Sequence, residues 1–191
     1  MKQSFLFIII LFAFYNAALS QVKFEQETRI KKKEVPESAI KFIEKFGFKK
    51  KIKWYKETNV NSSSIEAKTK FRKRKYSIEF DLNGNLEDLE IQIPSKEIPE
   101  KTAVNIFKNF KKNHLRYEVE KIQIQYSGDE ESIVQKVIKG IDSKNVKTQY
   151  EIVIIAKIDK KFQKLEYLFS EQGDLIKSQK IILKNTDNLE Y

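Results

Sequence analysis

The chain has 191 residues, with 37 Lys or Arg against 27 Asp or Glu, and a formal net charge of +10. Hydrophobic residues make up 40% of it and aromatic residues 12%, which is too many for a disordered polyelectrolyte. Cysteine is absent and only one histidine occurs. Disulfide scaffolds, thiol nucleophiles and metal sites of cysteines or paired histidines are therefore excluded, and the length is too short for a multidomain enzyme.

The first twenty residues have the pattern of a secretory signal peptide. Lys2 precedes the eleven-residue apolar run 5–15, and Ala18 and Ser20 place small residues at the −3 and −1 positions before Gln21. The apolar run is well short of the roughly 20 residues that span a bilayer. We therefore expect a signal peptide at 1–20, no membrane span after its removal, and export to the periplasm or the extracellular space.

Two stretches of the mature chain follow one plan. Residues 35–40 (VPESAI) recur as 98–104 (IPEKTAV), and each copy places a proline at a helix start and then apolar residues at helical spacing. Further along, 76–86 (YSIEFDLNGNL) is echoed by 165–175 (LEYLFSEQGDL). Both halves therefore indicate a helix, then strands, then a glycine turn.

We predict an α+β fold made of two tandem units, each with one helix packed on a four-stranded antiparallel sheet. An arrangement that would join the two units is one continuous, curved sheet of eight strands, with the helices on one face. The predicted segments are an N-terminal segment at 21–34, a first unit at 35–94, a second unit at 98–184 and a tail at 185–191.

The second unit contains an additional segment of helical character. Apolar residues at helical spacing and Gly140 near the end predict a short inserted helix near 130–141. This helix would either cover the sheet or recognise a partner.

Trial pairing of the first unit's strands separates an apolar face from a charged one. With a two-residue turn at Lys73-Arg74, Phe71 lies opposite Tyr76 and Ala67 opposite Phe80, all on one face. The other face then carries Lys68 and Lys70.

The pattern at these positions resembles a known family. The helix start at 35–40, the Lys53-Trp54 strand and the Tyr-x-Ile-x-Phe-Asp-x-Asn-Gly strand and turn at 76–84, after a cleaved signal, are similar to the PepSY-like domains of exported bacterial proteins. That group is also similar to β-lactamase inhibitor proteins. The resemblance implies tandem helix-plus-four-strand units in a curved sheet. It also implies an exported binding or inhibitory protein without an active site of its own.

No residue pattern in the chain predicts catalysis, a cofactor or a metal. His114 lies in a polar link after the second predicted helix and is expected to be a solvated loop residue. Segment 81–87 has some character of a calcium loop, but it lacks the bidentate glutamate and is expected to be a hairpin turn. No nucleophile elbow or phosphate-binding loop is present. We therefore do not expect an enzyme.

A cluster of basic residues is the candidate site for binding a partner. Lysines at 49–51 and 53 lie just before the opening strands, and six cations occur within eight residues at 68–75. Export makes nucleic acid an improbable partner, which leaves a solvated face or a contact surface for an acidic protein, lipid head group or polysaccharide. The candidate residues are Lys68, Lys70, Arg72, Lys73, Arg74 and Lys75.

Two functional hypotheses follow. The first is an exported, non-catalytic binding protein that inhibits or regulates a partner protein through its sheet face and loops. The alternative is an envelope-associated structural protein that binds anionic surfaces electrostatically through the basic residues. The expected partner is a protein or an anionic envelope component, without a cofactor and without nucleic acid.

Overall fold

A computed structural model of the chain describes residues 21–59 and 62–183. The predicted signal peptide at 1–20 and the predicted tail at 185–191 lie outside these residues. Among the residues described, no helix is both long and apolar enough to cross a membrane. The elements are β1 (Gln21–Ile30), η1 (Lys32–Glu34), α1 (Glu37–Glu44), β2 (Lys53–Thr58), β3 (Ser63–Phe71), β4 (Arg74–Phe80), β5 (Leu86–Gln92), η2 (Ser95–Glu97), α2 (Glu100–Asn113), β6 (Tyr117–Gly128), α3 (Glu130–Lys139), β7 (Val146–Ile158), β8 (Lys161–Ser170) and β9 (Leu175–Leu183).

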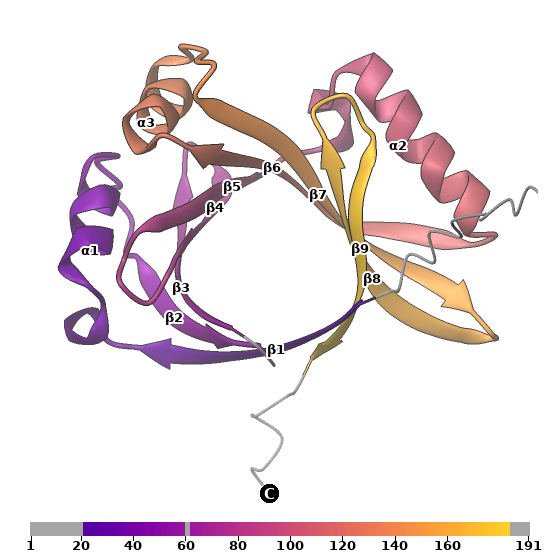
Figure 1. The fold of residues 1–191 in the computed structure, drawn as a ribbon, viewed down its shortest axis with the longest axis horizontal. Coiled ribbons are helices and arrows are strands. Elements are labelled where there is room, and N and C mark those ends of the chain that lie inside the picture. The colour runs from indigo at the N-terminus through magenta and orange to yellow at the C-terminus, as the bar shows by residue number, and fades with distance from the viewer. Residues whose placement is uncertain (1–20, 60–61, 184–191) are drawn as a thin grey trace, which may run out of the picture.

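The strands form one closed sheet in chain order (Figure 1). Each strand pairs antiparallel with the next one from β1 to β9. The ring is closed by a parallel pair between β1 and β9, which runs from Gln21↔Gln179 to Glu25↔Leu183. The β5–β6 pair joins the two halves of the chain, so they share a single sheet.

The predicted α+β class, with helices packed on a sheet, is confirmed, but the predicted strand count is wrong. The described residues contain nine strands, because the N-terminal segment 21–34 includes β1. In the sequence of β1 the apolar alternation of Val22, Phe24 and Ile30 is interrupted by Gln26 and Thr28, so the pattern that predicts a strand is weak. It also pairs with β9, a partner far away in the chain. The division of the chain into two units stays a prediction.

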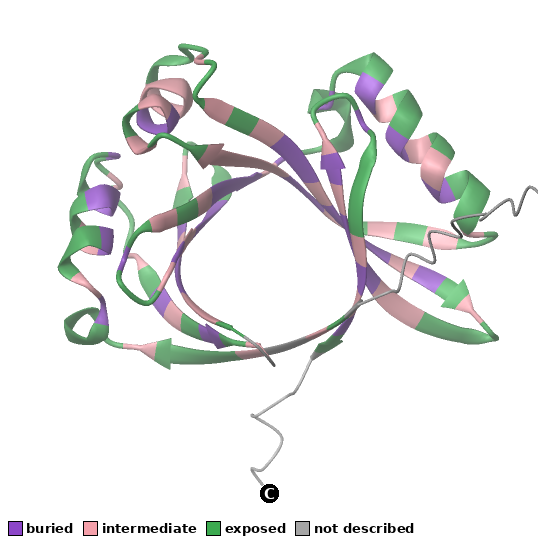
Figure 2. Ribbon diagram, viewed as in Figure 1, coloured by how far each residue is buried: buried purple, intermediate pink, exposed green. Residues whose placement is uncertain are grey.

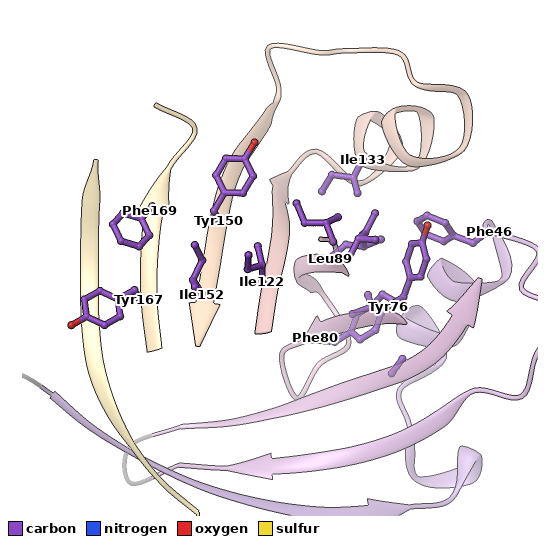
Figure 3. Packing of buried hydrophobic residues seen from close by; sticks show 14 of the residues in the cluster. Phe46, Tyr76, Phe80, Leu89, Ile122, Ile133, Tyr150, Ile152, Tyr167 and Phe169 are labelled. Atoms are coloured by element: carbon purple, nitrogen blue, oxygen red, sulfur yellow. The ribbon is translucent and has the colours of Figure 1, made fainter. Parts of the chain in front are cut away.

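The hydrophobic core lies on the outer face of the ring. All three helices lie outside the sheet, and buried residues concentrate between helices and strands (Figures 1 and 2). Phe42 of α1 packs its ring 5.7 Å from that of Phe80. Phe110 of α2 lies 5.1 Å from Tyr167 and 5.5 Å from Phe169. Figure 3 shows these outward-facing strand residues as one continuous layer.

Helix α3 occupies the position where the sequence predicts a short helix. Asp129 caps its first turn by accepting a hydrogen bond from the Ser132 backbone N–H, and Gly140 ends it in the left-handed conformation. Ile133 is fully buried. The helix contacts β6, where the Lys136 ammonium lies 5.3 Å from the centre of the Tyr126 ring. It therefore covers the outer face of the sheet between α1 and α2 (Figure 1).

The β3–β4 turn lies one residue earlier than predicted. Arg72 and Lys73 have φ angles of 47° and 66°, the backbone of a primed two-residue turn. Phe71 therefore pairs with Arg74, and Ala67 pairs with Ile78. The register differs from the trial pairing by two residues, which leaves every side chain on its predicted face.

Two hairpin turns lie in close contact with the first turns of α1 and α2, and each contact is made at a glycine. A β-carbon added at Gly84 would lie 2.7 Å from Pro36 Cβ, and one at Gly173 would lie 2.7 Å from the Thr102 carbonyl oxygen. Beside Gly173, the Thr102 hydroxyl donates a hydrogen bond of 2.8 Å to the Glu171 carbonyl. Both glycines also have positive φ. The turns β4–β5 and β8–β9 thus fix the start of α1 and α2 on the sheet.

We expect Gly173→Ala to lower the free energy of unfolding by about 2–3 kcal/mol, because the new methyl group meets helix backbone and the φ is unfavourable. Gly140→Ala is the matched control, since it also has positive φ but open space around it; its cost should be about 1 kcal/mol. Urea unfolding of the two variants provides the measurement. Equal losses in both would show that helix and turn are not in close contact.

Candidate functional site

The closed sheet surrounds a polar cavity of about 630 Å³. Side chains alternate along a strand, so the residues between the outward apolar ones point inward. All nine strands contribute to the lining, mostly with lysine and glutamate. Its inward residues include Lys23, Glu27, Lys53, Glu57, Glu66, Lys68, Lys70, Lys75, Ser77, Glu79, Glu90, Gln92, Lys121, Gln123, Glu151, Lys164 and Glu166.

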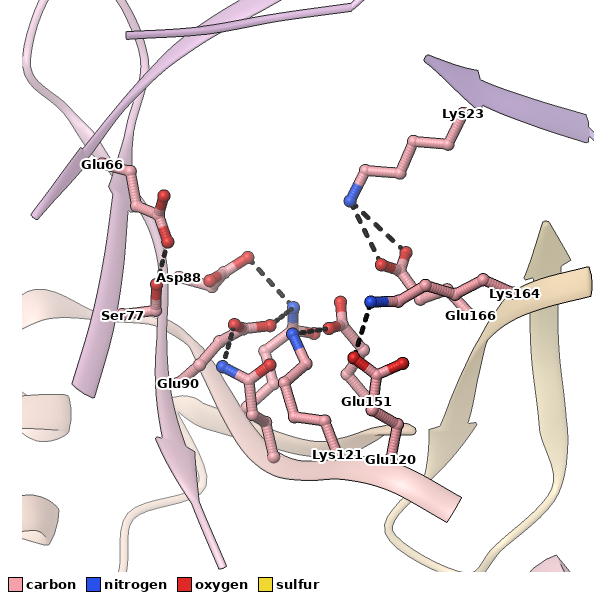
Figure 4. A network of polar contacts seen from close by, with 12 residues as sticks. Lys23, Glu66, Ser77, Asp88, Glu90, Glu120, Lys121, Glu151, Lys164 and Glu166 are labelled. Carbon is pink, nitrogen blue, oxygen red and sulfur yellow. Dashed lines mark hydrogen bonds and ion pairs between the residues drawn. The ribbon is translucent and has the colours of Figure 1, made fainter. Parts of the chain in front are cut away.

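Ion pairs link the strands across the inner surface, either between neighbours or between strands that have one other strand between them (Figure 4). Glu166 is only 8% exposed, and Gln179 also donates to it at 2.6 Å. Such pairs lower the large cost of burying a charge. The ammonium-to-carboxylate distances are 3.2 Å for Lys121–Glu151, 2.7 Å for Lys164–Glu120 and 3.2 Å for Lys23–Glu166.

A group of carboxyls lies together where β4, β5 and β6 adjoin. Glu79 of β4 pairs with Asp88 of β5 in the sheet register, and Glu90 lies two residues further along. Gln123 donates a 2.6 Å hydrogen bond to Glu90, and Gln125 donates one of 3.1 Å to Asp88 (Figure 4). The glutamines of β6 thus provide amide donors to acids that have few cations beside them.

Burial makes these acids weak. It raises the pKa of Asp88 to about 7, with the charge of Glu151 adding to the effect. Burial, followed by the charge of Asp88, also raises the pKa of Glu79. For Glu90, burial and then Glu151 raise the pKa well above its usual range. At neutral pH part of this group therefore carries protons and offers O–H donors to the cavity.

Lys68, one of the six predicted binding residues, forms ion pairs inside the protein. Its ammonium lies 2.6 Å from Glu27 and 2.9 Å from Glu66. Burial alone would lower the pKa of Lys68, but the two carboxylates raise it above its ordinary value. Its ion-pair partners therefore lie within the sheet, Glu27 on β1 and Glu66 on its own strand β3.

The other five predicted residues do not form one surface. Lys70 and Lys75 are exposed and line the end of the cavity. Arg72-Lys73 forms the tip of the turn, with the Arg72 guanidinium 5.0 Å from the centre of the Phe71 ring. Arg74 points to the outer face and forms a 2.8 Å ion pair with an acid of η2. The structure thus separates the six cations into inner, tip and outer groups.

Sequence reasoning missed the acidic part of the cavity. Glu90, Glu151 and Glu166 come from different strands, and none belongs to a motif. Polar or charged residues at alternating positions of β4 to β6 were the available signal. In an open sheet that pattern means only a solvated face.

Three carboxylates could in principle hold a cation. Glu27, Glu57 and Glu66 each place an oxygen within 4.8 Å of the others. The Lys68 ammonium already lies against two of them, so a metal ion would have to displace it. Segment 81–87 is a hairpin turn, in which the Asp81 carboxylate accepts the backbone N–H groups of Asn83 and Asn85.

The expectation of a solvated His114 is wrong. Its Nε2 lies 2.6 Å from the Tyr167 hydroxyl, a hydrogen bond, and the ring packs beside Tyr117. Burial lowers the pKa of His114. The residue anchors the end of α2 against the outer face of the sheet, away from the cavity lining.

No family model matches the sequence, and no curated protein matches it. Among solved structures, a DUF2874 family protein from Bacteroides ovatus aligns with a TM-score of 0.50 and 13% identity, over 76% of this chain and 87% of its own. A candidate periplasmic protein from Bacteroides eggerthii aligns with a TM-score of 0.51 and 13% identity, over 76% of this chain and 88% of its own. A BLIP-like protein from Bacteroides fragilis aligns with a TM-score of 0.49 and 16% identity, over 82% of this chain and 92% of its own.

At these identities the likeness concerns the fold alone. The fold of this chain is thus similar to that of the DUF2874 family protein and of the Bacteroides eggerthii protein. The relation to PepSY-like domains and the tandem repeat stay predictions.

We expect the buried carboxyls to make stability fall as pH rises. In the unfolded chain Asp88 ionises near its ordinary value of 3.8, whereas in the folded protein its pKa is about 7. Between these values the folded state binds more protons, so each such group removes up to about 1.4 kcal/mol of unfolding free energy per pH unit of increase. Asp88→Asn should reduce this slope, as measured by urea unfolding at about pH 5 and about pH 8. An unchanged slope in the variant would contradict the raised pKa.

Lys68→Met should destabilise the protein by about 1–3 kcal/mol, because it leaves Glu66 buried without its counter-charge. The double variant with Glu66→Gln should recover most of this loss. Lys70→Met is the control at the next inward position, and it should change stability by less than about 0.5 kcal/mol. Thermal and urea unfolding report the differences. Failure of Glu66→Gln to rescue would show that Lys68 acts by packing alone.

Proposed function

We propose that the protein is an exported, non-catalytic binding protein, and that its ligand site is the charged cavity together with the lysines at its mouth. Export is supported by the signal pattern at 1–20. The structural neighbour from Bacteroides eggerthii, described as a candidate periplasmic protein, is consistent with the same compartment.

The burial of charge in the cavity carries this proposal. Glu90 is 4% exposed and Glu166 8% exposed, in a protein whose apolar core lies elsewhere, on the outer face. Burying such groups costs free energy that well-packed apolar residues would not cost. Proteins retain features of this kind mainly where function requires them. The charged lining therefore supports a ligand site.

Closure of the sheet changes how a partner protein would bind. Helices cover the outer face, and β1 and β9 pair with each other, so no described strand leaves a long free edge along the ring. A flat sheet face or edge, as the sequence-based hypothesis of a protein inhibitor requires, is therefore lacking in the described part of the chain. A partner protein would reach the inner face of the sheet only by inserting a loop into the cavity mouth.

Electrostatic attachment to an anionic envelope surface is the second candidate. The turn Arg72-Lys73 projects from the sheet with both side chains exposed, and neither forms an ion pair with a described residue. Attachment through such residues weakens as salt screens the charges.

A retention experiment distinguishes the two functions. The chain 21–191 is immobilised and exposed to envelope and culture-medium extracts at low salt and at about 0.5 M salt. We expect the protein to retain material at high salt and to lose it in the Gln92→Trp variant, because the larger side chain takes up part of the cavity beside the ligand. Lys101→Trp on the exposed face of α2 is the control.

Retention that is lost in salt, persists in Gln92→Trp and disappears in the Arg72→Ser, Lys73→Ser variant would favour electrostatic attachment. Ligand released from the protein should be chemically unchanged. Conversion during incubation would contradict a non-catalytic role.

A further inference from the structure

We infer that the cavity binds a small acidic sugar, a polyhydroxylated molecule that carries a carboxylate, sulfate or phosphate group. The inference rests on the proposed function and specifies its ligand class. It combines three observations, which are the unpaired cations at the mouth, the hydrogen-bonding groups of the interior and the closed shape of the site.

Five lysines gather at one end of the cavity. They come from the α1–β2 connection, from β2 and from the two strands joined by the Arg72-Lys73 turn, and all five are exposed. None forms an ion pair within the described residues, in contrast with the lysines of the interior. The mouth lysines are Lys50, Lys51, Lys53, Lys70 and Lys75.

The register brings like charges together at this end. Lys70 lies directly opposite Lys75, and Lys53 lies directly opposite Lys68. Like charges in directly opposed positions destabilise a sheet, whereas opposite charges there would stabilise it. An anion bound at the mouth would remove this repulsion, so the arrangement favours a ligand with at least one negative group.

The interior can bind hydroxyl groups. Gln123 is 6% exposed and lines the cavity. It uses its amide nitrogen on Glu90, and its amide oxygen has no hydrogen-bond partner among the described residues. That oxygen is itself buried, so the hydroxyl groups of a ligand would meet the carboxyls of the lining first. Nearby carboxyls supply both acceptors and, when protonated, donors.

The size and lining of the cavity disfavour lipids and extended or helical peptides. Its volume of about 630 Å³ lies within the range of about 300–1,000 Å³ typical of sites for small molecules. Few large apolar side chains line it, which disfavours lipids. A peptide that adds a strand would need a free sheet edge, and one that binds as a helix would need an apolar groove. A charged sugar matches both the lysines and the hydrogen-bonding interior.

Isothermal titration of the chain 21–191 with defined probes tests the inference. The acidic probes are trigalacturonate, a sulfated chondroitin disaccharide and a hexose phosphate, which separate the three sources of negative charge. The neutral probe is maltotriose, and the probes of other classes are a hexaglutamate peptide and phosphatidylglycerol vesicles. We expect at least one acidic sugar to bind at least about tenfold more tightly than maltotriose.

Substitutions of lysines test whether the acidic sugar binds at the mouth of the cavity. Changing Lys53, Lys70 and Lys75 to Ser should lower the affinity for the acidic sugar about tenfold or more. The variant should remain folded, because the three side chains are exposed. The matched control changes Lys101, Lys108 and Lys112 of α2 to Ser, with the same loss of charge outside the cavity. An equal loss of affinity in both variants would overturn the inference, since net charge alone would explain it.

The failures of the inference and of the proposed function are distinguishable. Preference for the hexaglutamate peptide, abolished by Gln92→Trp, would refute the sugar class and leave the cavity as the binding site. Binding only to vesicles, insensitive to Gln92→Trp, would refute both. Equal affinity for maltotriose and its acidic counterparts would contradict the role of the mouth lysines.

Discussion

The structure depends on where the sheet buries its apolar face. Strands of this chain alternate apolar and polar residues, and the apolar set packs outward against α1, α2 and α3. Small closed sheets are usually filled by the side chains that point inward. Here the helices supply the core from outside. The inward set is therefore free to be polar, and a cavity remains.

This arrangement explains why the charged groups are partly buried. In an open sheet, Glu90, Lys121 and Glu151 would face water, and their alternation would mean only solubility. Once β1 pairs with β9, the same residues surround an enclosed volume with less solvent. Burial then raises the pKa of the acids, strengthens the ion pairs and leaves the exposed lysines concentrated at one end. A ligand site is the simplest physical use of such a surface.

Much of the local structure was predictable from particular residues. Pro36 and Pro99 stand immediately before α1 and α2, and Gly84 and Gly173 mark the turns that contact them. The faces of β3 and β4 were also predicted, because a register error of two residues leaves side-chain direction unchanged. The ring closure was not predictable, since the apolar alternation of β1 is interrupted and the strand joins one from the other end of the chain. The interior ion pairs depend on that closure and were missed with it.

The sequence by itself determined the basic character of the protein, the α+β class, the helix starts and the division of β3 and β4 into an apolar and a charged face. These properties are local, because propensity and periodicity act over a few residues. Only the tertiary structure decided that the charged face is the inside of a ring, that Lys68 pairs with Glu27 and Glu66, and that the mouth lysines stay unpaired among the described residues. Those facts depend on contacts between residues far apart in the chain, and periodicity carries no information about such pairings.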